Sequence, residues 1–131
     1  MEREEIIQYW LDTADYDFHT MTHLFDSCDF PWALFMGHLV IEKLLKALYV
    51  KEIDINPPRI HDLLRLAEKT SLPLNDEIKD TLDLISSFNI SVRYPDYKRS
   101  FYRKCTNEYT EKNINIIKEL RTWILSVIRK T

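Results

Sequence analysis

The chain of 131 residues contains a single glycine, Gly37. Tight two-residue hairpins depend on glycine, and so do the Walker-type phosphate loop and the dinucleotide-binding fingerprint. The sequence therefore excludes nucleotide binding by either of those two loops. It also argues against a sheet protein, and it shows no strand-like alternation, internal repeat or low-complexity tract.

Cysteine is also scarce, since only Cys28 and Cys105 occur. They are far apart in the sequence, no Cys-x-x-Cys pair is present, and no secretory leader precedes Trp10. Proteins of reducing compartments show this usage. We therefore expect a reduced, cytoplasmic protein.

A long uninterrupted apolar run is missing as well. The most apolar stretch, from Phe30 to Val50, is interrupted by four polar residues, His38, Glu42, Lys43 and Lys46. One charge near the centre of a bilayer costs about 2.5 kcal/mol or more. This stretch is therefore predicted to be a buried helix of a globular protein, with no membrane association.

The residues that are present favour one α-helical domain covering residues 1–131. The chain is 45% hydrophobic and 30% charged, which is typical of a globular protein of this length. Apolar residues recur at helical spacing, and Asp29, Asp62 and Asn75 stand where N-caps are expected. The predicted helices cover about 4–25, 30–51, 62–69, 76–88, and a last helix from 106 or 110 to 129. An up-and-down bundle of about five helices follows, with the second helix at its centre.

The segment from Val92 to Lys104 concentrates positive charge and aromatic rings. It carries +4, which leaves −7 on the rest of a chain whose net charge is −3. We predict that Pro95 keeps it from forming a continuous helix, and that it collects an anion such as phosphate while its rings stack on a base or fill a groove. The alternative is an ordinary surface loop anchored by tyrosines. Its cations are Arg93, Lys98, Arg99, Arg103 and Lys104, its one acid is Asp96, and its rings are Tyr94, Tyr97, Phe101 and Tyr102.

A line of polar residues crosses the apolar second helix. His38, Glu42 and Lys46 follow one another at intervals of four residues. Because an uncompensated buried charge is costly, this line is expected to face a groove, a subunit interface or a cation such as Arg93. The alternative is an exposed Glu42–Lys46 pair. Farther along, His61 precedes the expected cap Asp62 and could bond to a carbonyl or hold an anion.

The first helix offers a possible metal site. Asp12, Asp15, His19 and His23 fall within roughly 80° of one another on the helix face. The stripe lies opposite the apolar face, so a solvated surface is the alternative, and no metal or cofactor is predicted. No serine or cysteine stands in a motif that would activate it, and no catalytic residue is assigned.

Several motifs occur together in this chain: Trp10, Ala14, Asp17, Phe35, the run from Ile41 to Leu48, Pro57-Pro58, His61-Asp62-Leu63 and Arg93-Tyr94-Pro95-Asp96. Together they resemble those of the HEPN domain family. In that family the module is helical, commonly homodimeric, and often adjacent to a minimal nucleotidyltransferase. The resemblance implies nucleotide or RNA binding, or a place in a toxin–antitoxin pair.

Ribonuclease members of that family use an arginine followed four to six residues later by a histidine. No histidine follows His61 in this chain, so the enzymatic reading is disfavoured. We expect a non-catalytic module in which one groove holds a nucleotide or RNA phosphate. There are two alternatives: a degenerate ribonuclease that uses His61 and Arg93, and a pure protein-interaction module. The residues expected in the groove are Arg93, Tyr94, Asp96, Lys98, Arg99, Arg103, Glu42, Lys46 and His61.

Overall fold

The computed structural model describes residues 2–130, and within that range it contains six helices and no strand. The predicted all-α class is confirmed, with one helix more than expected. The helices are α1 (Arg3–Asp26), α2 (Phe30–Glu52), α3 (Leu63–Glu68), α4 (Asp76–Arg93), α5 (Pro95–Lys104) and α6 (Asn107–Arg129).

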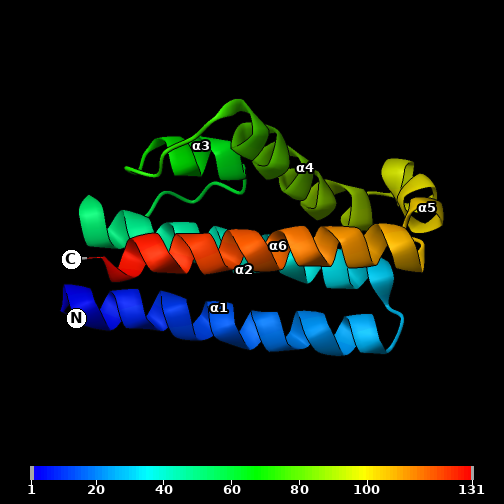
Figure 1. Ribbon diagram of the computed structural model, residues 1–131, viewed down its shortest axis with the longest axis horizontal. Coiled ribbons are helices and arrows are strands. Elements are labelled where there is room, and N and C mark those ends of the chain that lie inside the picture. The colour runs from blue at the N-terminus through cyan, green and yellow to red at the C-terminus, as the bar shows by residue number, and fades with distance from the viewer. Residues whose placement is uncertain (1, 131) are drawn as a thin grey trace.

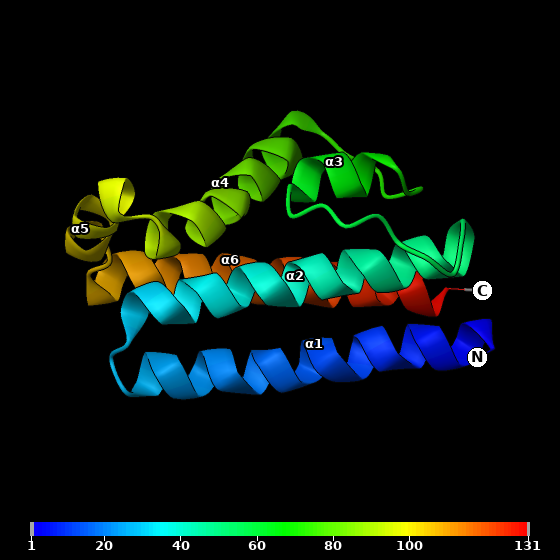
Figure 2. The same ribbon diagram turned by 180° about the vertical axis from the view of Figure 1, so that it is seen from behind.

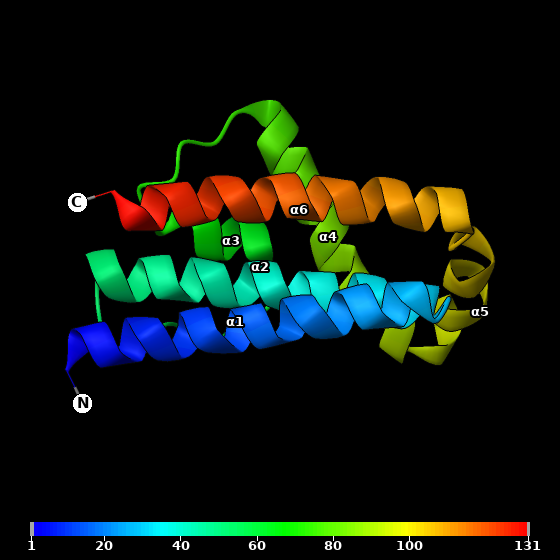
Figure 3. The same cartoon turned by 60° about the horizontal axis from the view of Figure 1, so that its bottom comes forward.

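The four long helices form an up-and-down bundle around α2. Helix α2 packs against α1, α6, α4 and α3, whereas α5 packs mainly against α4 (Figures 1 and 2). Turning the molecule shows α1, α2 and α6 running side by side, with α3 and α4 behind them (Figure 3). Helix α5 lies at one end of the bundle, and the first turn of α1 lies at the other (Figure 1).

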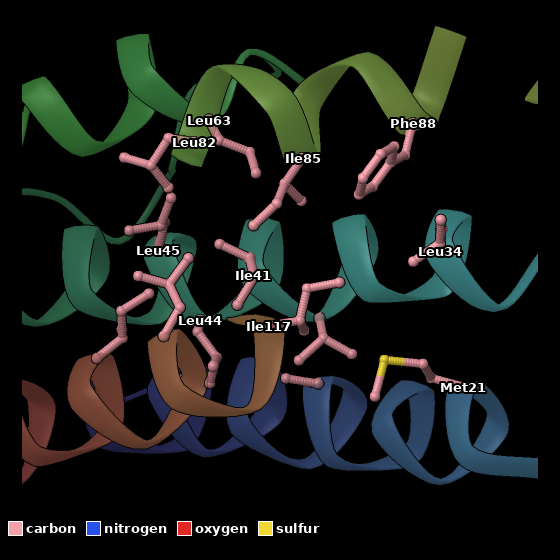
Figure 4. Packing of buried hydrophobic residues seen from close by; sticks show 14 of the residues in the cluster. Met21, Leu34, Ile41, Leu44, Leu45, Leu63, Leu82, Ile85, Phe88 and Ile117 are labelled. Carbon is pink, nitrogen blue, oxygen red and sulfur yellow. The ribbon is translucent and has the colours of Figure 1, made fainter. Parts of the chain in front are cut away.

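The core forms on both sides of α2, because this helix is apolar around nearly its whole circumference. Ile41 and Leu45 meet Leu82 and Ile85 of α4 on one side, while Ile117 of α6 reaches α2 from the other (Figure 4). Each of these side chains is at most 1% exposed. Burial of each contributes about 1.5–3 kcal/mol.

The single glycine of α2 lies directly against side chains of α6 and α1. A Cβ atom at Gly37 would collide with Cδ1 of Ile117 and would also touch Sδ of Met21, on α1. The missing side chain therefore allows three helices to meet at this point.

The turn between α1 and α2 is built without glycine. Cys28 takes the left-handed conformation, with φ 61°. Its N–H donates to the Phe25 carbonyl at 3.0 Å, and the N–H of Asp29 donates to the Leu24 carbonyl at 2.8 Å. These two bonds make a Schellman motif, which ends α1 and turns the chain back along itself.

Pro95 does keep the segment from Val92 to Lys104 from forming one continuous helix, but the segment is mostly helical, so the alternative of a surface loop is wrong. Helix α4 runs on to Arg93, five residues beyond the predicted end at Phe88, and α5 begins at Pro95. Tyr94 between them is extended, with φ −97° and ψ 127°. The reason is positional, since proline lacks a backbone N–H and disfavours the α conformation of the residue before it. Both effects suit a helix start, so Pro95 separates two helices.

Within residues 2–130, every helix is too short or too polar to span a lipid bilayer.

Candidate functional site

The polar line on α2 is buried. His38 is 0% exposed, Glu42 5% and Lys46 8%. Together with His61, from the linker between α2 and α3, they form a group that we call the Glu42 cluster. The exposed Glu42–Lys46 pair that was the alternative reading is therefore wrong.

The Glu42 carboxylate is the centre of this cluster. Its Oε1 accepts from Nδ1 of His61 at 2.7 Å, and its Oε2 accepts from Nζ of Lys46 at 3.3 Å. Both oxygens of the buried carboxylate thus have a partner, one of them a cation. This compensation makes the charge tolerable in an apolar helix.

His38 binds the linker at the same place. Its Nε2 lies 3.0 Å from the carbonyl oxygen of His61. Because a carbonyl can only accept, Nε2 carries the proton and Nδ1 is an unprotonated acceptor, which has no partner among residues 2–130. Burial lowers the pKa of His38 below its usual 6.5, while the bond to His61 and the charge of Glu42 act in the opposite direction.

Protonation of His38 should make stability depend on pH. The unfolded chain binds a proton on His38 near pH 6.5, whereas the folded chain binds it only at lower pH. The free energy of unfolding should therefore fall as pH drops below 6.5, by at most about 1.4 kcal/mol per pH unit. His38→Gln, which keeps a donor for the linker, should flatten this slope in urea unfolding between pH 7 and pH 5. Equal slopes in both proteins would contradict the assignment.

The linker is held by further polar contacts around His61. Asp62 caps α3 by accepting from the N–H of Arg65 at 3.2 Å, as predicted, and Ser86 Oγ accepts from the N–H of Leu63 at 2.9 Å. The side chain of His61 remains 64% exposed beside a hollow of about 350 Å³. Asp62 and Asp83 line that hollow, and two acids there oppose a phosphate.

Arg93 closes α4 and is held in place by neighbours. Its Nε donates to the carbonyl of Asn89 at 3.0 Å, and its guanidinium carbon lies 6.0 Å from the ring centroid of Phe35 and 5.6 Å from that of Tyr94. Its positive charge contributes to lowering the pKa of His38. Arg93 thus lies between the Glu42 cluster and α5.

Helix α5 presents the remaining cations. Lys98, Arg99, Tyr102 and Arg103 line a shallow hollow of about 550 Å³, and Nζ of Lys98 lies 5.6 Å from the ring centroid of Tyr102. All four side chains are exposed. The helix offers three positive charges and a ring on one surface, a combination suited to phosphate and a stacked base.

The nine predicted site residues therefore fall into separate groups. Glu42, Lys46 and His61 are brought together, as expected. Lys98, Arg99 and Arg103 line a different hollow on α5, and Asp96 lines a third one between α4, α5 and α6. Tyr94 lies with Arg93 at the junction of α4 and α5. Among residues 2–130, the hollow beside His61 has no lining residue from α5, and the two hollows that α5 lines contain no member of the Glu42 cluster.

Trp10 contacts the Glu42 cluster, which its position in the sequence did not predict. Nζ of Lys46 lies 5.3 Å from the centroid of the Trp10 ring, so the buried cation stands over an aromatic face. Trp10 is part of the family pattern, but no spacing rule connects it to Lys46, far along the chain. Only the packing of α1 on α2 brings them together.

The acid and histidine stripe on α1 forms no metal site in the part of the chain that is described. Asp12, Asp15, His19 and His23 are all exposed. Asp15 accepts from Arg121 at 3.3 Å and lies 3.7 Å from His19. Over residues 2–130, no group of three or more potential ligands is placed to hold a metal ion.

The structure is that of an up-and-down helical module. It has one central apolar helix that carries the buried Glu42 cluster, and a basic helix at one end. The model of the HEPN domain family matches residues 7–128, and the chain belongs to that family.

The fold is also found in a crystal structure. The protein TT1696 from Thermus thermophilus superposes with a TM-score of 0.76 at 18% identity, over 92% of this chain and 96% of the other. At this identity the match shows the shared fold alone. A comparison with curated proteins finds no match.

Proposed function

We propose that this HEPN domain is a non-catalytic module that holds the phosphate groups of a nucleotide or RNA on α5. The observation that carries the proposal is the surface formed by Lys98, Arg99, Tyr102 and Arg103 around one hollow. Because the chain as a whole has a net charge of −3, this cationic surface is set apart from an acidic body. Such a local field attracts anions and steers their association.

The family membership supports an accessory role. HEPN domains are often paired with a minimal nucleotidyltransferase, and we propose such a partner here, in a homodimeric assembly. In this role α5 holds phosphate while the partner carries out the chemistry. Coexpression with a candidate transferase, followed by size-exclusion chromatography, tests the assembly separately from ligand binding.

A ribonuclease built on His61 and Arg93 is less well supported. Arg93 is bonded to the Asn89 carbonyl and stacked near Phe35, whereas the hollow beside His61 is lined by Asp62 and Asp83. Two carboxylates at that position would repel a phosphodiester and the phosphorane formed from it.

Removing charge from α5 should weaken RNA binding. Each single-strand phosphate contact contributes a salt slope of about −0.7, so two lost contacts weaken binding on the order of 25-fold at 0.1 M salt. Arg99→Gln with Arg103→Gln should show this loss, and a shallower salt slope, in titrations of a labelled RNA oligonucleotide at two salt concentrations.

The matched control is Lys112→Gln with Lys118→Gln, which removes two exposed cations from α6. This control should bind as the wild type does. Absence of RNA binding by the wild type, or equal affinities of the α5 and α6 variants, would rule the proposal out.

A further inference from the structure

A second hollow lies at the end of the bundle opposite α5. It has a volume of about 540 Å³ and is lined by residues from the first turns of α1, the later part of α2 and the linker that follows α2. We call it the α1 groove. The residues of its wall that matter here are Tyr9, Trp10, Lys46, Asn56, Pro57 and Arg59. Its volume falls within the range of pockets that enclose small molecules.

One wall of the groove contains a buried cation. Lys46 is 8% exposed, and its ammonium donates to Glu42 at 3.3 Å. An ammonium has three N–H donors, and this is the one hydrogen bond that the Lys46 ammonium makes within residues 2–130. Because Glu42 is also bonded to His61, the position of Lys46 is fixed and its other donors are free for an anion.

A second cation stands at the rim. Arg59 is exposed and has no ion pair or side-chain hydrogen bond with any residue from 2 to 130. Together with Lys46, and against the carboxylate of Glu42, it leaves a net charge of +1 at the groove. A net positive charge attracts a phosphate group, and a guanidinium can grip it through two parallel hydrogen bonds.

Aromatic rings line the same groove. Tyr9 and Trp10 lie with their centroids 5.4 Å apart at an interplanar angle of 77°, and Tyr9 is 54% exposed. Ile6, Ile55 and Pro57 add apolar surface, and the amide of Asn56 can both donate and accept hydrogen bonds. The exposed ring of Tyr9 and the half-buried ring of Trp10 beside an apolar wall suit a flat aromatic ligand, and the amide suits the polar edge of a base.

We propose that the α1 groove binds a mononucleotide unit, in which a planar base lies against Tyr9 and Trp10 and one phosphate lies between Lys46 and Arg59. This site is independent of the one on α5, from which it is separated by the length of the bundle (Figure 2). Two sources offer the same chemistry: a free nucleoside monophosphate and the 5′-phosphorylated end of an RNA.

Calorimetric titration of the full chain tests this site. AMP and GMP should bind more tightly than inorganic phosphate or adenosine, because only the nucleotides use both the rings and the cations. Tyr9→Ser and Arg59→Gln, both at exposed positions, should each weaken AMP binding about tenfold or more. The matched control Arg65→Gln on α3 should leave it unchanged.

Further titrations distinguish a free nucleotide from an RNA end, and the α1 groove from the site on α5. If a 5′-phosphorylated RNA binds more tightly than its 5′-hydroxyl counterpart, and Arg59→Gln abolishes the difference, the ligand of the groove is an RNA end. If the two RNAs bind equally while AMP still binds, the ligand is the free nucleotide. Arg99→Gln with Arg103→Gln should leave AMP affinity intact, so failure of α5 binding does not imply failure here. No AMP binding at millimolar concentration, AMP no tighter than inorganic phosphate, or unaltered binding in both groove variants would overturn the proposal.

Discussion

Glu42→Ala is expected to lower the free energy of unfolding by about 3–5 kcal/mol at pH 7. The substitution removes the carboxylate that Lys46 and His61 share, and it leaves the ammonium of Lys46 buried without a counter-charge. An unpaired buried charge costs far more than the pair itself contributes. Urea unfolding followed by far-ultraviolet circular dichroism measures the loss.

Glu119→Ala serves as the control, because Glu119 is exposed on α6 and makes no side-chain ion pair with residues 2–130. Its effect should stay within about 0.5 kcal/mol. Glu42→Ala with Lys46→Met should recover part of the lost stability, since an apolar side chain of similar length replaces the stranded cation. A loss below about 1 kcal/mol in Glu42→Ala would show that the buried pair is not formed.

Phe101→Ala is expected to cost about 3–5 kcal/mol and to release α5 from the bundle. Phe101 is 6% exposed and lies 5.8 Å, centroid to centroid, from Phe88 of α4. Helix α5 has little other contact with the body, because it packs mainly on α4 and makes only a small contact with α2. Urea unfolding measures the stability, and the amides of residues 98–104 should exchange with solvent faster than in the wild type.

Tyr97→Ala removes a ring from the same helix at a position that is 56% exposed, and it should change stability by less than about 0.5 kcal/mol. RNA affinity should fall in Phe101→Ala, since Lys98, Arg99 and Arg103 are no longer held on one surface. Wild-type stability and exchange rates in Phe101→Ala would show that α5 does not depend on this anchor.

The sequence predicts the long helices well because their stability comes from apolar stripes that sequence spacing reveals. Helices α1, α2 and α6 begin and end within a few residues of the predicted bounds, and the caps Asp62 and Asn75 form as expected. The helical bundle follows from these stripes, because each must be buried against another helix. Apolar spacing and N-cap residues are therefore enough to predict these helices.

The helices on either side of Pro95 could not be predicted from the sequence in this way. A proline that interrupts one helix is equally suited to the first turn of the next. The choice between these readings depends on Phe101, which gains stability from α4 only once α5 is helical. That contact between two helices is invisible to sequence spacing.

The candidate site could be predicted in part for the same reason. A polar line on an apolar helix required partners, and His61 proved to be one of them. The separation of Lys46 from the cations of α5 could not be deduced, since it depends on the direction in which the chain leaves α4. The α1 groove was missed because Trp10 and Arg59 come from segments far apart in the sequence.

The most direct test of the proposed function is a map of where phosphate binds. Amide chemical shifts of the ¹⁵N-labelled protein would be followed during titration with a short 5′-hydroxyl RNA. The largest changes should fall on residues 96–104, and they should shrink at high salt. Changes centred elsewhere, or none within α5 at saturating RNA, would contradict the assignment of phosphate binding to this helix.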